Sequence, residues 1–272
     1  MNTPATASNP IARLLERIGR SVVVGIEAVG FTCSMFAEAV WWLLVGWRRK
    51  QPVRIPAVFA EMMDIGILAL PILGVLSATI GMMLAIQGIY QLRQFGAESQ
   101  VVLGVAFSVV REFAPLITGI LVAGRSGSAL AARLATMKIN QEVDALWVMG
   151  IMPVRFLVAP PLLAMVIMLP LLTFFSMVLG LLAAGFYISA DLGMSLPAYF
   201  DQVREFLSND DFMHGIGKSL LFAVAIAMIG VANGASVTGG AEGVGRVTTR
   251  SVVHAISAIV IIDMLFAFMA TR

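Results

Sequence analysis

The sequence predicts an all-α membrane protein, with an N-terminal interfacial amphipathic helix followed by five transmembrane helices. Of its 272 residues, 59% are hydrophobic and only 12% are charged, whereas about 25% are charged in ordinary soluble domains. A soluble fold of this length has too small a core to bury so much apolar surface, so lipid must be its main solvent. This composition excludes a secreted enzyme, a nucleic-acid-binding module and a disordered scaffold.

Five stretches are long and apolar enough to cross a bilayer, which takes about 20 residues. The third is long enough to tilt or to project beyond the bilayer, and the fourth needs its flanking residues to reach across. The five predicted spans are Ile65–Ile89, Val101–Val122, Phe156–Ala190, Leu220–Ala235 with its flanks, and Val252–Met269. We expect them to form one membrane domain over residues 55–272.

The segment before these spans, residues 11–54, has a different pattern. Trp41, Trp42 and Trp47 cluster near its end, where they would lie at the level of the lipid headgroups. A charged face combined with such tryptophans predicts a helix lying in the membrane interface, and a sixth, poor span is the alternative. The charges that define the face or interrupt the apolar run are Arg13, Arg17, Arg20, Glu16, Glu27 and Glu38. Residues 1–10 are polar and are expected to form a disordered tail.

The distribution of lysine and arginine predicts the orientation in the membrane, because these residues are enriched in cytoplasmic loops. A cytoplasmic N-terminus places most of them inside, and five spans then give a periplasmic C-terminus. The loop after the third span carries five acids against Arg204 alone, as expected outside. Within this loop, Leu196–Leu207 has the pattern of an amphipathic helix.

Catalytic and metal-binding patterns are missing from the sequence. Gly215–Ser219 only resembles a phosphate-binding loop, because Phe212 stands where the first glycine is required. His214 and His254 are predicted on opposite sides of the membrane, and no HExxH, CxxC or GxSxG pattern occurs. Cys33, the single cysteine, cannot form an internal disulfide. We therefore expect no enzyme activity, no metal site and no cofactor.

Charged residues inside the predicted spans are the most informative feature. Arg111 and Glu112 lie in the middle of the second span, and Asp263 lies in the last. A charge at the bilayer centre costs at least about 2.5–3.5 kcal/mol, so such side chains normally pair or line a cavity. Lys218 could reach Glu112 by extending inward from the start of the fourth span. A structural ion pair and a polar patch in a substrate path are both open interpretations.

Gly74, Gly81 and Gly88 recur every seven residues along the first span. Small residues at such spacing allow helix backbones to approach closely. We therefore predict tight packing of this span, either within the chain or between two copies, with a substrate groove as the alternative.

Several motifs occur in a fixed order along the chain. They are Arg111-Glu112-Phe113-Ala114-Pro115-Leu116, Ala123-Gly124-Arg125-Ser126-Gly127-Ser128-Ala129, Met137-Lys138, Gln141-Glu142-Val143-Asp144-Ala145-Leu146, and Glu242-Gly243-Val244-Gly245-Arg246. Together they resemble the MlaE/YrbE permeases, the membrane subunits of MCE-type ABC lipid transporters, over roughly residues 60–270. One position departs from that family, in which an acidic residue usually stands where this chain has Arg133.

The resemblance implies that residues 123–155 form a cytoplasmic coupling segment, which presses a short helix into a groove of a separate ATP-binding cassette ATPase. An amphipathic helix with exposed acids suits such a groove. The expected contact residues are Gln141, Glu142, Asp144, Ala145, Leu146 and Gly150. ATP hydrolysis would then belong to the ATPase, and this chain would be a non-catalytic subunit.

The resemblance further implies a homodimer in a bacterial inner membrane, beneath a periplasmic lipid-binding MCE protein, with a small STAS-domain subunit as a further partner. The substrate would be phospholipid, and the function would be the maintenance of outer-membrane lipid asymmetry. The polar residues best placed to line the lipid path are Tyr90, Arg111, Glu112 and Lys218.

Two alternatives from other functional classes stay open at the level of sequence. The first is an autonomous proton-coupled carrier that uses Glu112, His254 and Asp263. The second is a passive scaffold for an MCE ring. Inverted repeats, which are common in carriers, are not evident in the sequence.

Overall fold

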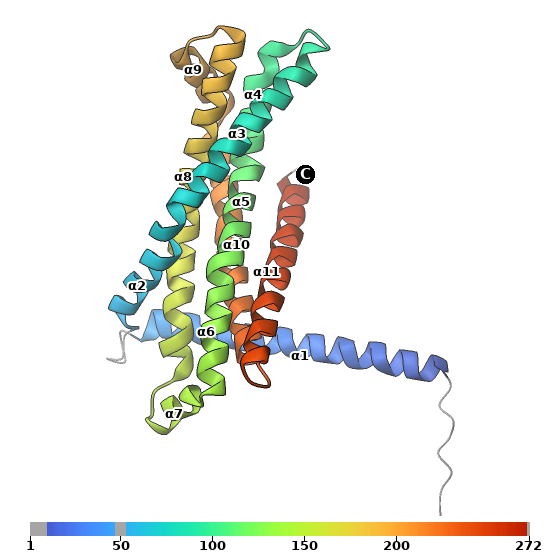
Figure 1. Cartoon of the computed structure of the whole chain (residues 1–272), viewed down its shortest axis with the longest axis vertical. Coiled ribbons are helices and arrows are strands. Elements are labelled where there is room, and N and C mark those ends of the chain that lie inside the picture. The colour runs from blue at the N-terminus through green and yellow to red at the C-terminus, as the bar shows by residue number, and fades with distance from the viewer. Residues whose placement is uncertain (1–9, 47–52, 271–272) are drawn as a thin grey trace, which may run out of the picture.

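The computed structural model describes residues 10–46 and 53–270, and within these ranges the chain is helical apart from short connections (Figure 1). Five helical stretches are long and apolar enough to cross a membrane: Ile55–Arg93, Glu98–Ile139, Val154–Leu192, Asn209–Ala235 and Ala241–Met269. The predicted fold class is thereby confirmed for the described residues. The predicted tail over residues 1–10 lies outside these ranges except for Pro10, which begins α1, and Trp47 also lies outside them.

The first two stretches are interrupted helices. The first consists of α2 (Ile55–Ile65), the 3₁₀ turn η1 (Ile67–Ala69) and α3 (Leu70–Arg93). The second begins with the 3₁₀ turn η2 (Glu98–Gln100). It continues through α4 (Val101–Phe107), the π-helical turn η3 (Ser108–Phe113), α5 (Ala114–Val122), the π-helical turn η4 (Ala123–Gly127) and α6 (Ser128–Ile139). The helix of the predicted second span therefore runs well past Val122, into the segment expected to contact the ATPase.

The remaining stretches are more regular. A short helix, α7 (Glu142–Val148), precedes the π-helical turn η5 (Val154–Val158) and the long α8 (Ala159–Leu192). The predicted amphipathic helix of the loop that follows is present as α9 (Leu196–Phe206), capped by the Ser195 side chain. The last two helices are α10 (Asn209–Ala235) and α11 (Ala241–Ala270).

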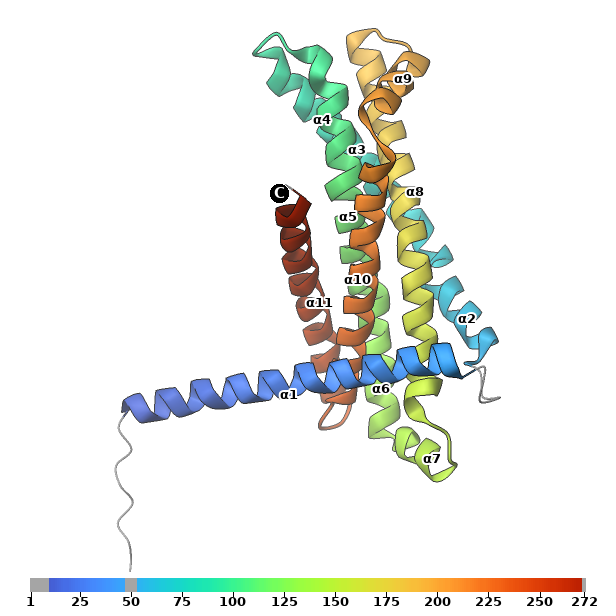
Figure 2. The same ribbon diagram turned by 180° about the vertical axis from the view of Figure 1, so that it is seen from behind.

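The N-terminal helix α1 (Pro10–Val45) runs across the bundle, and one half of it projects beyond the other helices in both views (Figures 1 and 2). Its C-terminal half packs on the bundle, where Ala39 is fully buried. Its other half exposes large apolar side chains, among them Ile26 and Val29. A helix that crosses the spans and exposes apolar side chains has the geometry of an interfacial helix.

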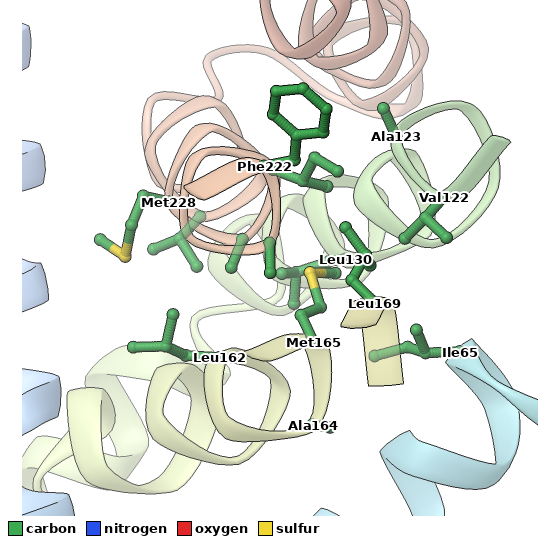
Figure 3. Packing of buried hydrophobic residues seen from close by; sticks show 14 of the residues in the cluster. Ile65, Val122, Ala123, Leu130, Leu162, Ala164, Met165, Leu169, Phe222 and Met228 are labelled. Atoms are coloured by element: carbon green, nitrogen blue, oxygen red, sulfur yellow. The ribbon is translucent and has the colours of Figure 1, made fainter. Parts of the chain in front are cut away.

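Two clusters of buried apolar side chains hold the bundle together. The larger lies toward α1, where Phe222 and Met228 of α10 meet side chains of α8, such as Met165, and of the second stretch, such as Leu130 (Figure 3). The smaller lies toward α9, which Tyr199 anchors by donating a hydrogen bond to the Leu181 carbonyl at 3.1 Å. Burial raises the pKa of the Tyr199 phenol, so it stays a neutral donor.

Helices α3 and α8 approach each other closely. A Cβ atom at Gly81 would lie 2.1 Å from the carbonyl oxygen of Gly180. Beside this contact, the hydroxyls of Ser77 and Ser176 are 2.7 Å apart and hydrogen-bonded. The glycine spacing noted in the sequence therefore serves packing within the chain at this position.

We expect Gly81→Ala to lower the thermal stability of the protein in detergent, because the added methyl group meets backbone that cannot rotate away. Overpacking of this kind costs about 1–3 kcal/mol. Gly104→Ala, at a helical position with no atom within 4 Å of the added Cβ, is the matched control. It should leave the melting temperature unchanged or raise it, since alanine favours helix over glycine. Equal melting temperatures for the two variants would contradict this account.

Candidate functional site

A fully buried lysine forms the centre of a charge cluster inside the bundle. Lys218 of α10 is 0% exposed, and its Nζ donates to Glu112 Oε2 at 2.6 Å. The same Nζ lies 3.0 Å from Asp263 Oδ1 of α11. The pairing of Lys218 with Glu112 that the sequence suggested is present. The second carboxylate, from Asp263, was recognised in the sequence as an intramembrane charge but not as part of this cluster.

Arg111 does not pair with its neighbour Glu112. Its Nε donates to Asp211 Oδ1 at 2.7 Å. Its guanidinium carbon lies 5.2 Å from the centroid of the Phe107 ring. Asp211 is almost fully buried and also accepts from the Ser208 backbone amide at 2.8 Å, which caps the start of α10. The Arg111 side chain remains 40% exposed, so it can still meet a ligand from the open side.

The π-helical turn η3 places these two neighbouring residues. Arg111 and Glu112 reach Asp211 and Lys218, which are seven residues apart on α10, or about 10 Å along a helix axis. Their side chains must therefore diverge along α10. Such π-helical turns inside α-helices are frequent at functional sites.

The two histidines lie on different helices, His214 on α10 and His254 on α11. The ring of His214 stacks edge-on against Phe266, with the ring centroids 4.8 Å apart. His254 lines a shallow hollow with Arg246 and Arg250. His254 is nine residues from Asp263, or about 14 Å along a helix. The three residues considered for a proton-coupled carrier are thus not assembled, since only Glu112 and Asp263 share a partner.

Of the four residues expected to line a lipid path, the structure brings two into contact and places a third next to them in the chain. Glu112 and Lys218 are in direct contact, and Arg111 adjoins them on η3. Tyr90 is 67% exposed near the end of α3 and takes no part in the charge cluster. The cluster of Arg111, Asp211, Glu112, Lys218 and Asp263 is the candidate site, and we call it the interhelical charge cluster.

Comparison with known proteins identifies the family. The family model described as Permease MlaE matches residues 58–269. The chain belongs to the MlaE permease family. It is a multi-pass protein of the bacterial inner membrane and a permease subunit of an ABC transporter. Such permeases work with an ATPase and with substrate-binding partners.

Individual relatives agree with this assignment. The intermembrane phospholipid transport system permease protein MlaE of Haemophilus influenzae is 31% identical, over 94% of this chain and 96% of its own length. A probable ABC transporter permease of Rickettsia typhi is 32% identical, over 90% of this chain and 96% of its own. The chloroplastic protein TRIGALACTOSYLDIACYLGLYCEROL 1 of Arabidopsis thaliana is 35% identical, over 70% of this chain and 55% of its own.

Arg133, which the sequence marked as an expected departure from the family pattern, forms an ion pair in the structure. Arg133 Nη2 lies 2.6 Å from Glu61 Oε1 of α2. Eight residues earlier, in η4, Arg125 Nη1 donates to the Asp64 carbonyl oxygen at 2.8 Å. A local ion pair is therefore present at Arg133, and it joins α6 to the start of the first span.

The expected coupling helix is α7, at the end of the bundle opposite α9 (Figure 1). It is bounded by two residues with left-handed backbone, Gln141 at φ 61° and Gly150 at φ 73°, which isolate it as a separate turn. Leu146 is buried against the protein, whereas the other predicted contact residues are exposed. The exposed apolar tip formed by Trp147, Val148 and Met149 was not among the predicted contact residues, although its three consecutive apolar residues next to Gly150 are visible in the sequence.

We expect Lys218→Met to lower the free energy of unfolding by about 3–5 kcal/mol, because it leaves two carboxylates without a counter-charge inside the bundle. Glu112→Gln should cost less, since Asp263 still neutralises the lysine. The triple variant that combines Lys218→Met with Glu112→Gln and Asp263→Asn should be more stable than Lys218→Met alone, because it leaves no uncompensated charge among these three residues. Denaturant titration in detergent measures all three.

Arg246→Met, at an arginine that is 75% exposed and forms an exposed ion pair within α11, serves as the control and should change stability little. If the triple variant were no milder than Lys218→Met, the cluster would not be held by the electrostatic interaction described here.

Proposed function

We propose that this chain is the permease subunit that passes phospholipids between the inner membrane and a periplasmic MCE-domain protein, in support of outer-membrane lipid asymmetry. The observation that carries the proposal is the interhelical charge cluster, with a partly exposed cation, Arg111, inside an apolar bundle. A phospholipid has an anionic phosphate and two acyl chains, so it needs apolar walls and a cationic group in its path. The Haemophilus influenzae relative is named as an intermembrane phospholipid transport permease, which supports this substrate.

The residues of the cluster have separate roles in this proposal. Arg111 is the group that meets the lipid phosphate, because guanidinium binds phosphate oxygens in a bidentate geometry and its side chain is accessible. Lys218 is wholly enclosed and engaged by two carboxylates, so it joins η3, α10 and α11 rather than meeting lipid. Glu112, 41% exposed at its side chain, would border the path while its pairing with Lys218 holds η3 against α10. Tyr90 would stand apart from them, toward the outer end of the path.

A second copy of the chain completes the path in this proposal. α3 and α11 both expose large apolar side chains along their length, including Val75, Met83, Val260 and Leu265. Lipid and a partner copy can both cover such faces. The N-terminus would be cytoplasmic and the C-terminus periplasmic, which places α9 and the ends of α3 and α8 toward the MCE protein. A small STAS-domain subunit is a further expected partner.

The ATPase would bind the α7 end of the bundle. The acids Glu142 and Asp144 together with Trp147 form a protruding surface of mixed charge and apolar character, which suits a groove on a soluble partner. Because η5 and α8 follow α7 directly in the chain, a displacement of α7 would be passed to the third span.

Charge reversal on α7 tests the ATPase contact. We expect Glu142→Lys with Asp144→Lys, and separately Trp147→Ala, to reduce co-purification of the ATPase with the permease at least tenfold. Asp201→Lys reverses one charge on α9, at the opposite end of the bundle, and should leave co-purification unchanged. Normal ATPase recovery with both α7 variants would exclude α7 as the contact.

Reconstituted lipid transfer tests the substrate and the energy source together. With the permease, ATPase and MCE protein in liposomes, Arg111→Gln should lower ATP-dependent transfer of a fluorescent phospholipid at least tenfold per assembled complex. Arg93→Gln removes an arginine that pairs with Glu98 and Asp191 outside the charge cluster and is the matched control.

Two outcomes would overturn the proposal. One is wild-type phospholipid transfer by Arg111→Gln. The other is transfer driven by a proton gradient without the ATPase, which would favour the autonomous carrier.

A further inference from the structure

A cavity of about 380 Å³ lies between the crossing helix α1 and the short helix α7, with α6, η5 and the end of α10 completing its wall. None of its described lining residues belongs to the interhelical charge cluster. Its volume falls in the range of cavities that hold drug-sized molecules, about 300–1,000 Å³. We propose that this cavity binds a cationic amphiphile, with its apolar body inside and its ammonium group at the rim.

The inner wall of the cavity is apolar. Val231 of α10 and Val158 of η5 are 1% and 3% exposed, and Leu134 of α6 is 6% exposed. Met35 of α1 and Leu157 of η5 add flexible and branched apolar surface. This wall would remove an aliphatic or aromatic group from water without offering it a hydrogen-bonding partner, so the bound body must be apolar.

The rim of the cavity carries the charge that selects the ligand. Glu38 of α1 and Asp144 of α7 both line the cavity and are both exposed, which places them where it opens to solvent. Among the described residues, neither forms an ion pair, and Glu38 accepts one long hydrogen bond, 3.4 Å, from the Trp42 indole. Both carboxylates are therefore available to a ligand cation.

Among the described residues that line the cavity, Lys138 is the one cation, and it is engaged elsewhere. Lys138 donates its ammonium to the carbonyl oxygen of Ala235, the last residue of α10. Carbonyl groups at a helix C-terminus carry partial negative charge, so they hold a cation favourably. Arg155 lies over the Trp42 ring, 5.3 Å from its centroid, and does not line the cavity. The rim therefore presents two carboxylates against one lysine that the end of α10 already stabilises, and it favours a cationic ligand.

Matched probes test the charge selection directly. The full chain is placed in nanodiscs of phosphatidylcholine and titrated with 6-phenylhexylamine and with 6-phenylhexanoic acid, which share one apolar body and differ in charge. Calorimetry should show saturable binding of one amine per chain, at least tenfold tighter than binding of the acid. Glu38→Gln and Asp144→Asn should each weaken amine binding about fivefold, as expected for an exposed ion pair. Glu142→Gln removes the same charge from α7 at a residue that does not line the cavity and should leave it unchanged.

Photolabelling of the unmodified chain supplies a second readout that no variant can disturb. An amine probe that carries a diazirine should label residues 31–38 and 143–158, and excess 6-phenylhexylamine should prevent the labelling. Three results would overturn the proposal: equal binding of amine and acid, an equal loss of binding in Glu142→Gln and Asp144→Asn, or labelling confined to the lipid-facing helices α3 and α11. The proposal does not depend on which substrate the bundle transports.

Discussion

The architecture depends on the neutralisation of one buried ammonium group. Lys218 lies inside α10 with no exposed surface, and it is held by carboxylates from η3 and α11. A charge enclosed in this way is tolerated only when its partners are in place. The three helices must therefore keep one rotation and one depth relative to each other, which no contact between apolar side chains would require so strictly.

Close backbone contacts impose the second constraint on the bundle. α3 meets α8 at Gly81 and Gly180, and α10 meets the second stretch at Gly230, where a Cβ would lie 3.0 Å from the Gly127 carbonyl oxygen. Inside a membrane, apolar side chains gain little by leaving lipid for protein, so close packing and polar contacts supply the association between helices. The bundle combines both: small residues allow the helices to approach, and the interhelical charge cluster fixes their register.

The two ends of the molecule differ in what they offer to partners. At the α9 end, Tyr199 and the Ser208 cap hold a short amphipathic helix against the spans. At the other end, α7 protrudes between two left-handed residues, and α1 crosses the bundle beside it. The cavity between α1 and α7 lies where a helix in the membrane interface meets the proposed contact with the ATPase, so a ligand there would touch both.

The sequence by itself determined which segments enter the membrane, because hydropathy and length act locally along the chain. It identified five spans, the crossing N-terminal helix, the amphipathic helix at Leu196–Leu207 and the charged residues at membrane depth, and its ordered motifs identified the family. Only the tertiary structure decided which charges pair with each other. Asp263 pairs with Lys218, Asp211 pairs with Arg111, and Glu61 pairs with Arg133. These pairs join residues distant in sequence through the rotation and tilt of whole helices, and local hydropathy carries no information on either.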